Sequence, residues 1–476
     1  MAVADQPRTE KPGRSPEVVA RAERGKAARA AVPRTTHGEW TPPAGRRDPI
    51  ELLQEQAADR VQELLPIRYG RMLNSPFAFF RGAAYVMAAD LAGEPRTGLD
   101  VQLCGDAHLS NFGAFAAPDR RLIFTLNDFD ETLAGPFEWD LKRLVASFAV
   151  AGRDRGFDAK QRQKVNMTVT RSYREAMHGF AAMGTLELWY ARIELDEIAL
   201  MGAAHVTSKQ QKRFEKNLDK TRSKDSMRAF AKLTTVVDGR ARFVSEPPLL
   251  TPVEELVGSD RRAELDAYVR KVLSGYGRTL PSDRRRLLGR FRYADAARKV
   301  VGVGSVGTRA WVLLLLGRDG GDPLILQFKE AQASVLEPFL GRSEFDHHGR
   351  RVVEGQRLMQ AASDILLGWL PDVAGIDGRR RHFYVRQLWD QKASARLEDI
   401  PAQELAVYGG VCGWTLARAH ARTGPRAAIA AYLGGGDRFD RALADFAEAY
   451  AEQNERDYAA LVEAVKRGRI PAETGI

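Results

Sequence analysis

Two polar clusters, each just past a short apolar run, are the residues of this chain best suited to chemistry. Asp106 is followed five residues later by Asn111, and Asp128 comes seventeen residues after Asn111. The runs Val101–Cys104 and Leu122–Leu126 before them read as short buried strands, which hold side chains rigidly at a cleft. Carboxylate and amide oxygens suit Mg²⁺ together with phosphate oxygens, and a remaining carboxylate can accept the proton of an attacking hydroxyl.

Within this set we expect Asp106 to be the base and Asn111 and Asp128 to hold the metal, with Asp130 as a further ligand. His108 is either a ligand or base itself, or a brace for its own loop. The simpler alternative is that these Asp and Asn residues only form turns at strand ends. That alternative explains any one of them well, but the set of three poorly.

The first cluster resembles the catalytic loop of aminoglycoside phosphotransferases and other kinase-like enzymes. The run GDAHLSN is similar to their pattern H-G-D-x-H-x-x-N, although Cys104 replaces its first His. The run LNDFDE resembles the metal-binding segment of those enzymes, and GPFEWDLKRL resembles the start of their next helix. The resemblance implies that Asp140 braces the catalytic loop.

From about Arg68 onward the chain is also similar to a bacterial family known as domain of unknown function 2252. The similarity is carried by the runs SPFAFFRG, CGDAHLSNFG, NDFDET, EWDLKRL, QFKEA, EGQRLMQ and RQLWDQK. This resemblance implies a kinase-like fold but no substrate.

A glycine-rich segment lies much further along the chain. Gly302, Gly304 and Gly307 form a G-x-G-x-x-G, followed by strand-like runs over Trp311–Leu316 and Leu324–Lys329. Strands on both sides indicate a kinase type of loop, because a dinucleotide-binding loop leads into a helix. A glycine-rich turn without a ligand is the commoner origin of such a pattern. Lys329 favours the first interpretation, since it could meet the α- and β-phosphates of ATP.

A buried lysine needs a carboxylate partner, and Glu354, in the helical run Arg351–Ala362, is our candidate. Glu330 and Glu337 are rivals. Glu330 directly follows Lys329 on the same strand, so its side chain is expected on the opposite face of the sheet.

Arg81 is unusual because it lies in the apolar helical run Phe77–Leu91. It could reach toward a phosphate or pair with a carboxylate of the core, and the sequence favours neither.

The order of the motifs differs from that of ordinary kinases, in which the glycine loop and lysine precede the catalytic loop. We therefore expect an α+β, two-lobed protein-kinase-like fold in circularly permuted order, mostly helical with one small antiparallel β-lobe. The expected parts are a disordered basic tail (1–47), a helical lobe with the catalytic and metal loops (48–289), a nucleotide-binding β-lobe (290–392) and returning helices (393–476).

Composition predicts a cytoplasmic protein. Hydrophobic residues make up 44% and charged residues 28%, as in ordinary globular proteins. The longest strongly apolar run, Ala310–Leu316, is too short to span a membrane, and no signal peptide is visible near Met1. The two cysteines, Cys104 and Cys412, lie in apolar contexts and do not indicate a disulfide framework.

The net charge of +10 is concentrated in two segments. Residues 1–47 hold ten basic and five acidic residues, and Ser208–Lys232 holds nine basic and three acidic residues. Charge runs of this kind are more often solvated faces than nucleic-acid sites, so we do not expect nucleic acid as a partner.

The motifs together predict an enzyme that uses ATP and Mg²⁺ to phosphorylate an unknown small-molecule or protein hydroxyl. One alternative is transfer of AMP, with the nucleotide bound the other way round. Another is a regulator that binds nucleotide or nucleic acid without turnover.

Overall fold

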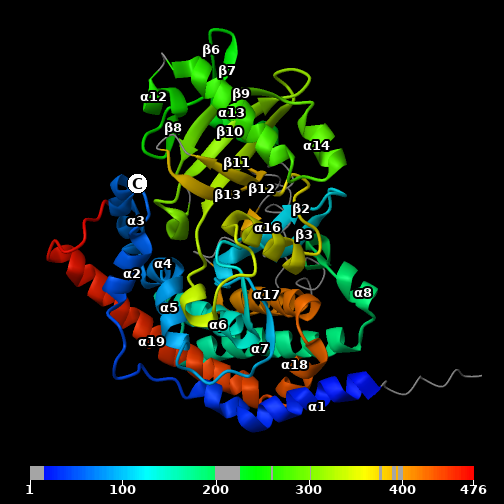
Figure 1. The fold of residues 1–476 in the computed structure, drawn as a ribbon. Helices are drawn as coiled ribbons and strands as arrows, with labels where there is room; N and C mark the ends of the chain where they lie inside the picture. Colours follow the sequence, from blue (N-terminus) through cyan, green and yellow to red (C-terminus); the bar gives the residue numbers. More distant parts are fainter. Residues whose placement is uncertain are drawn as a thin grey trace, which may run out of the picture.

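The computed structural model describes residues 16–198, 226–258, 261–300, 302–374, 378–388, 393–394 and 400–476. It is a mixed α+β structure in which every sheet is antiparallel. Figure 1 shows a sheet with its own helices above a larger helical part. Among the described residues, no helix is both long enough and apolar enough to cross a membrane.

The helical part is built around long amphipathic helices that share one apolar core. Its main helices are α6 (Phe137–Asp154), α7 (Ala159–Ala182), α17 (Ala402–Thr423), α18 (Arg426–Leu433) and α19 (Arg438–Lys466). Helices α7 and α17 approach so closely that a Cβ atom at Gly413 would overlap the backbone carbonyl of Val169. Helix α19 is continuous over its whole length of 29 residues.

Residues 16–47 are folded, which corrects the expectation of a disordered tail over 1–47. They form helix α1 (Pro16–Ala31) and the 3-10 turn η1 (Arg34–Gly38). Helix α1 packs against α18, and the hydroxyl of Tyr432 on α18 donates to the carbonyl of Val32 (3.0 Å). The segment looked disordered because its few apolar residues bury against another helix, which local composition does not reveal. Residues 1–15 lie outside the described residues.

The next helices are shorter than their hydrophobic periodicity predicts. The stretch that begins at Pro49 divides into α2 (Pro49–Ala57), η2 (Gln62–Leu64) and α3 (Leu65–Met72). The run Phe77–Leu91 divides into α4 (Pro76–Gly82) and α5 (Ala84–Leu91). The second division occurs at Ala83, which has non-helical backbone angles. The carbonyl of Gly82 accepts a hydrogen bond from Arg68 (3.1 Å) at this break.

The upper part is a six-stranded sheet in the order β12-β13-β11-β10-β9-β8. Its strands are β8 (Leu250–Pro252), β9 (Arg292–Lys299), β10 (Ala310–Leu316), β11 (Pro323–Ala331), β12 (Gly368–Ala374) and β13 (Arg380–Gln387). One face is apolar, because Leu326 and Phe328 share a core with residues of α13 (Arg262–Gly277) such as Tyr276. Since side chains alternate along a strand, Gln327 and Lys329 point to the other face.

The sheet part begins well before residue 290, which corrects the expected boundary of the helical lobe at 289. Several earlier elements pack on this sheet or pair beside it: α11 (Ser226–Leu233), β6 (Thr234–Val237), β7 (Arg240–Phe243), α12 (Val253–Val257), α13 and α14 (Ser282–Leu288). Their helical periodicity does not specify which core they cover. Only the three-dimensional packing assigns them to the upper part.

Two short sheets lie in the helical part, so the expectation of a single small β-lobe is incomplete. One pairs β1 (Asp100–Leu103) with β4 (Leu133–Pro136), and the other has the order β14-β2-β3-β5. The strands of the latter are β2 (Phe112–Ala116), β3 (Leu122–Leu126), β5 (Ile193–Glu194) and β14 (Ala393–Ser394).

The remaining described elements connect these parts. They are the 3-10 turns η3 (Leu109–Asn111) and η5 (Val303–Ser305) and the helices α8 (Thr185–Tyr190), α15 (Glu337–Leu340) and α16 (His348–Met359). Helix α16 contacts β12 and β13 on one side and α17 on the other, so it links the sheet to the helical part.

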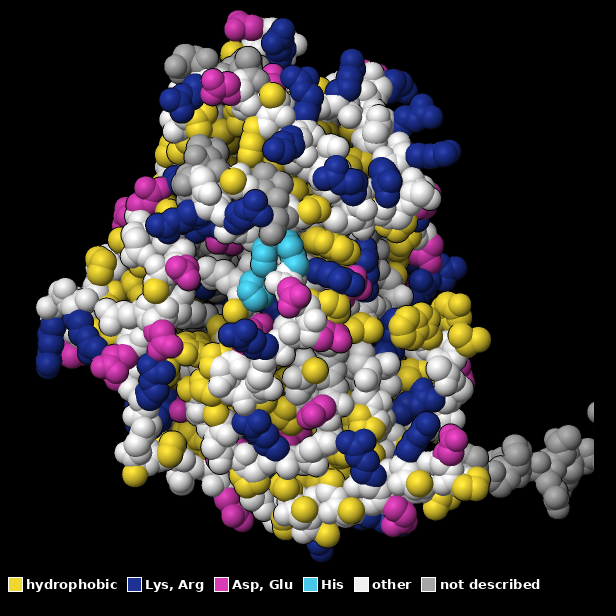
Figure 2. All heavy atoms as spheres, viewed as in Figure 1, with side chains coloured by type: hydrophobic (Ala, Val, Ile, Leu, Met, Phe, Trp, Pro, Cys, Tyr) yellow, Lys and Arg dark blue, Asp and Glu magenta, His cyan; other side chains and the backbone are white. Residues whose placement is uncertain are grey.

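Basic side chains on the face drawn in Figure 2 gather over the sheet and its helices. Three of these basic side chains are consecutive arginines on helix α14. Most of the basic segment Ser208–Lys232, up to residue 225, lies outside the described residues. Its last residues belong to α11.

The docking of α1 predicts a specific stability effect at Gly25. A Cβ atom there would overlap the carbonyl of Ala428 on α18, whereas nothing lies within 4 Å of a Cβ atom at Gly45. We expect Gly25→Val to lower the free energy of unfolding by about 1–3 kcal/mol, because overpacking forces the helices apart. Gly45→Val is the matched control. Urea denaturation that gives both variants the stability of the parent protein would contradict the docking of α1.

Candidate functional site

The β2–β3 hairpin brings the two polar clusters together. Phe112 pairs with Leu126 in its register, and the amide of Asn127 donates to the carbonyl of Asn111 (2.8 Å). Asn111 and Asp128 therefore lie at the same end of one hairpin, although seventeen residues separate them.

The loop that carries Asp106 is closed by its own hydrogen bonds. The backbone carbonyl of Asp106 accepts from the side-chain amide of Asn111 (2.7 Å) and from the amide of His108 (2.8 Å). The nitrogen of the Asn111 side chain is thus used by the loop, and its oxygen is the atom that could bind a metal.

Asp140, at the start of α6, holds the beginning of the same loop. Its buried carboxylate accepts from the amides of Cys104 (2.8 Å) and Gly105 (3.0 Å). Nε2 of His420 on α17 lies 3.2 Å from it. Gly105 has φ +84°, a conformation that a side chain disfavours. These contacts are the brace that the resemblance implies for Asp140.

The carboxylate of Asp106 is partly buried and fixed by an arginine. Arg143, also on α6, donates from Nε to Oδ1 of Asp106 (2.8 Å), and its Nη2 lies 2.8 Å from the same oxygen. Burial raises the pKa of Asp106 to about 6, while Arg143 opposes this rise. At pH 7 the group is mostly ionised, yet basic enough to accept a proton.

His108 is the neighbour of the other carboxylate oxygen. Its Nε2 lies 3.7 Å from Oδ2 of Asp106. Burial, followed by the charges of Arg81 and Arg143, lowers the pKa of His108 well below its usual value. The imidazole is therefore neutral at pH 7.

Lys329 of β11 reaches the segment Asp128–Thr132, here called the acidic segment, from the sheet side. Its ammonium contacts Oδ2 of Asp130 directly and lies 3.9 Å from Oδ2 of Asp128. The hydroxyl of Tyr384 on β13 donates to the other oxygen of Asp130 (2.8 Å). Burial opposes both charges, but the pair lowers the pKa of Asp130 and raises that of Lys329.

Asp130 therefore takes the place that we expected for Glu354, and the expected Lys329–Glu354 pair is absent. Glu354 lies near Arg357 on its own helix, at 3.4 Å. The rivals do not reach Lys329 either: Glu330 faces Arg309 (3.2 Å), and Glu337 lies 4.0 Å from Arg351.

Helix α16 presents an arginine, not a glutamate, to the acidic segment. Arg351 is buried and donates to the carbonyls of Thr132 (2.6 Å), Asp130 (2.7 Å) and Gln332 (2.8 Å). It holds the backbone of the acidic segment instead of the lysine side chain.

The glycine loop covers the cavity and is anchored at its far end. The carbonyl of Gly307 accepts from the amide of Val61 (2.8 Å), and Arg60 donates to the carbonyl of Val306 (2.6 Å). Gly307 has φ +88°, so a residue without Cβ suits it. At the tip, the hydroxyl of Ser305 lies 3.5 Å from the carboxylate of Asp130.

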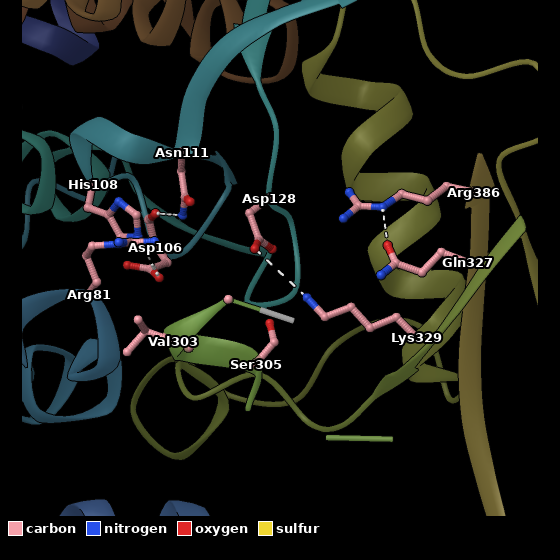
Figure 3. Close-up of a pocket in the computed structure, with 12 residues that line it drawn as sticks. Arg81, Asp106, His108, Asn111, Asp128, Val303, Ser305, Gln327, Lys329 and Arg386 are labelled. Carbon is pink, nitrogen blue, oxygen red and sulfur yellow. Dashed lines mark hydrogen bonds and ion pairs between the residues drawn. The ribbon is translucent and has the colours of Figure 1, made fainter. Parts of the chain in front are cut away.

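One cavity collects most of these groups (Figure 3). It is lined by Arg81, Asp106, His108, Asn111, Asp128, Gly302, Val303, Gly304, Ser305, Gln327, Lys329 and Arg386. Of the residues expected at the site, Gly307, Asp130 and Glu354 do not line the cavity. Gly307 anchors the loop and Asp130 holds the lysine.

Four residues of this site carried no assigned role in the sequence: Arg143, Ser305, Gln327 and Arg386. For Gln327 and Arg386, the alternation of side chains along their strands was a sequence signal. Gln327 alternates with the apolar Leu326 and Phe328, and Arg386 follows the apolar Val385, so both lie on the face opposite to that core. Arg386 donates to Gln327 (3.2 Å) and to the carbonyl of Asn127 (3.2 Å).

The donor set suits Mg²⁺ bound together with a phosphate. The oxygens of Asn111 and Asp128 face one cavity, and Mg²⁺ commonly uses one or two carboxylates with phosphate oxygens and water. Asp130, expected as a further ligand, is engaged by Lys329 and Tyr384. Among the described residues no cluster of three or more His, Cys, Asp or Glu could hold a metal by itself.

A family model matches residues 60–464, which cover most of the chain and all of the cavity. The chain belongs to this family. It is described as an uncharacterized protein conserved in bacteria (DUF2252), so membership assigns no activity. Comparisons with curated proteins and with solved structures gave no match.

The contacts of Asp140 predict that the loop depends on this side chain. Asp140→Ala leaves the buried amides of Cys104 and Gly105 without an acceptor, so we expect a loss of about 2–5 kcal/mol in unfolding free energy. Asp100→Ala, at the exposed start of β1, should change stability by less than about 0.5 kcal/mol. Equal urea midpoints for the two variants would show that Asp140 does not support the loop.

Proposed function

We propose that this protein is an ATP- and Mg²⁺-dependent phosphotransferase with a kinase-like, two-lobed fold in circularly permuted order. The observation that carries the proposal is the position of Lys329. Its ammonium lies 3.9 Å from the carboxylate of Asp128, although about 200 residues separate them in the chain. A phosphate-binding lysine, a glycine loop and a metal-binding carboxylate thus line one cavity, as phosphoryl transfer requires.

The cavity face of the sheet supports a nucleotide more than a simple anion. Gln327 and Arg386 lie next to Lys329, on the side away from Asp106 (Figure 3). They supply hydrogen-bonding groups beyond the lysine, where the rest of a nucleotide would extend. The glycine loop gives backbone amides that suit phosphate oxygens.

The cavity measures about 140 Å³, which is ample for a phosphate group.

The permutation is supported by the order of the elements. The catalytic loop follows β1, near the start of the helical part, whereas the glycine loop and lysine follow β9. Helices α17 and α19 then return to the core that contains α6 and α7. This is the expected kinase order with its two parts exchanged along the chain.

Each residue has a defined role in the proposed reaction. Lys329 binds the phosphates, and Asn111 and Asp128 hold Mg²⁺, which neutralises charge on the transferred group when it is bound. Oδ1 of Asp106 is occupied by Arg143, so Oδ2 accepts the proton of the acceptor hydroxyl. The acceptor oxygen then forms its bond to the γ-phosphorus as the bond from that phosphorus to the departing ADP oxygen breaks.

Mass spectrometry tests the reaction class. Incubation of the purified protein with Mg²⁺-ATP and an acceptor library should yield a product heavier by one phosphate. A product heavier by AMP would assign the alternative adenylyl transfer. ATP binding without consumption of ATP would favour the non-catalytic regulator.

The first prediction from this proposal concerns the metal. Asp128→Ala should weaken Mg²⁺-dependent ATP binding at least tenfold, because one of the two protein ligands is lost. In EDTA, which removes Mg²⁺, the variant and the parent protein should bind ATP with the same affinity. Asp119→Ala, at the other end of the same hairpin, serves as the control. Calorimetry that gives Asp128→Ala the Mg²⁺-ATP affinity of the parent protein would refute the metal role.

The second prediction concerns Asp106. Asp106→Asn keeps the shape of the side chain but cannot accept a proton, so kcat should fall about 10²–10⁴-fold with little change in ATP affinity. In the parent protein, kcat/KM should decrease as the pH falls below about 6, because protonation of Asp106 removes the base. This decrease should be missing in the variant. Collapse of ATP binding with normal turnover of the bound nucleotide would instead make Asp106 a structural or metal-binding residue.

A further inference from the structure

Arg81 is a partly buried cation in the cavity for which the described residues provide no partner. It lies on α4, and its Nε is inaccessible to water and forms no hydrogen bond. Six other arginines of the described ranges also have a buried nitrogen without a partner, but each is bonded through another nitrogen: Arg60, Arg68, Arg298, Arg351, Arg418 and Arg422. Arg81 forms no such bond and no ion pair among the described residues.

This arrangement suits a ligand. Nε of Arg81 has lost water without gaining an acceptor, which is unfavourable, and no protein group among the described residues bonds the other two nitrogens of the side chain. Burial lowers the pKa of Arg81, and only the more distant charges of Asp106 and Asp128 oppose this. No carboxylate or backbone oxygen in the described part of the chain pairs with Arg81, which disfavours the interpretation that it pairs with a core carboxylate.

Arg81 lies at the end of the cavity opposite to the sheet. Figure 3 shows Arg81, His108 and Asp106 on one side of Asp128, and Lys329, Gln327 and Arg386 on the other. The glycine loop lies against this end, since a Cβ atom at Gly304 would lie 3.6 Å from the carbonyl of Arg81. If Lys329 and Asp128 hold the phosphates, Arg81 is beyond the base, where an acceptor must lie.

The charges at this end leave Arg81 available to an anion. Arg143 is paired with Asp106, so these two charges compensate each other. Asp128 is the next carboxylate toward the lysine end, and no ion pair joins it to Arg81 among the described residues. Within the described ranges, Arg81 is therefore the unpaired cation at this end of the cavity.

We propose that Arg81 binds an anionic group of the acceptor, a phosphate or a carboxylate, and so directs a nearby hydroxyl to Asp106. This inference rests on the proposed phosphotransferase function, and it adds the class of substrate. A neutral polyol or sugar without an anionic group would leave Arg81 unpaired and would bind poorly.

Calorimetry with simple anions tests this proposal. The protein is first saturated with Mg²⁺ and the non-hydrolysable ATP analogue AMP-PNP, which occupies the lysine end. Inorganic phosphate and acetate are then titrated separately, and we expect saturable binding of at least one of them. The anion that binds more tightly identifies phosphate or carboxylate as the preferred group.

Three variants assign that binding to Arg81. Arg81→Gln should weaken the anion about ten- to hundredfold, as expected for loss of a charge-assisted hydrogen bond, with unchanged AMP-PNP affinity. Arg81→Lys keeps the charge and should recover part of the affinity. Arg318→Gln removes one positive charge from an exposed turn and should change nothing.

The outcomes separate this inference from the proposed function. Failure of AMP-PNP to bind the parent protein would overturn the proposed function, and the inference with it. Normal AMP-PNP binding without saturable binding of either anion would overturn only the role of Arg81. An Arg81→Gln variant that loses AMP-PNP affinity would assign Arg81 to the nucleotide and would also overturn the acceptor role.

Discussion

The ion pair between the buried Lys329 and the partly buried Asp130 is the contact on which the geometry of the cavity depends. It joins a strand of the upper sheet to the acidic segment that follows the β2–β3 hairpin. Tyr384, on the neighbouring strand, binds the second oxygen of Asp130, so the carboxylate is fixed from the sheet side on both oxygens. Removing one partner of such a pair leaves an uncompensated buried charge, which is far more costly than the pair itself is stabilising.

The two polar clusters are held in place by different parts of the molecule. Asp130 is held by the sheet, whereas Asp106 is held by Arg143 and its loop by Asp140, both on α6. The base and the lysine therefore belong to different parts of the molecule, and Asp128 lies between them. A ligand that bridges the cavity contacts both parts at once, which suits a reaction that needs two substrates aligned.

Much of the site could be predicted from the sequence, because its signals are local. The strand over Leu122–Leu126 has the predicted bounds, and the glycine loop lies between strands as expected. The partner of Lys329 could not be predicted in this way. We chose Glu354 because it lies on a nearby helix, but α16 turns Arg351 inward, and a buried arginine is the less common choice for a core position. Similarly, the folded state of residues 16–47 depends on packing against α18, far away in the chain.

The hydrogen bonds of Arg351 fix the acidic segment relative to helix α16. They end on backbone carbonyls, so they act on the path of the chain and not on one side chain. Gly355, one turn further along, is so close to Thr132 that a Cβ atom would overlap its side chain, and the helix cannot slide past it. Helix α16 and the acidic segment are consequently held in one fixed relative position. A molecule that displaced this helix from outside could realign Asp128 without ever entering the cavity.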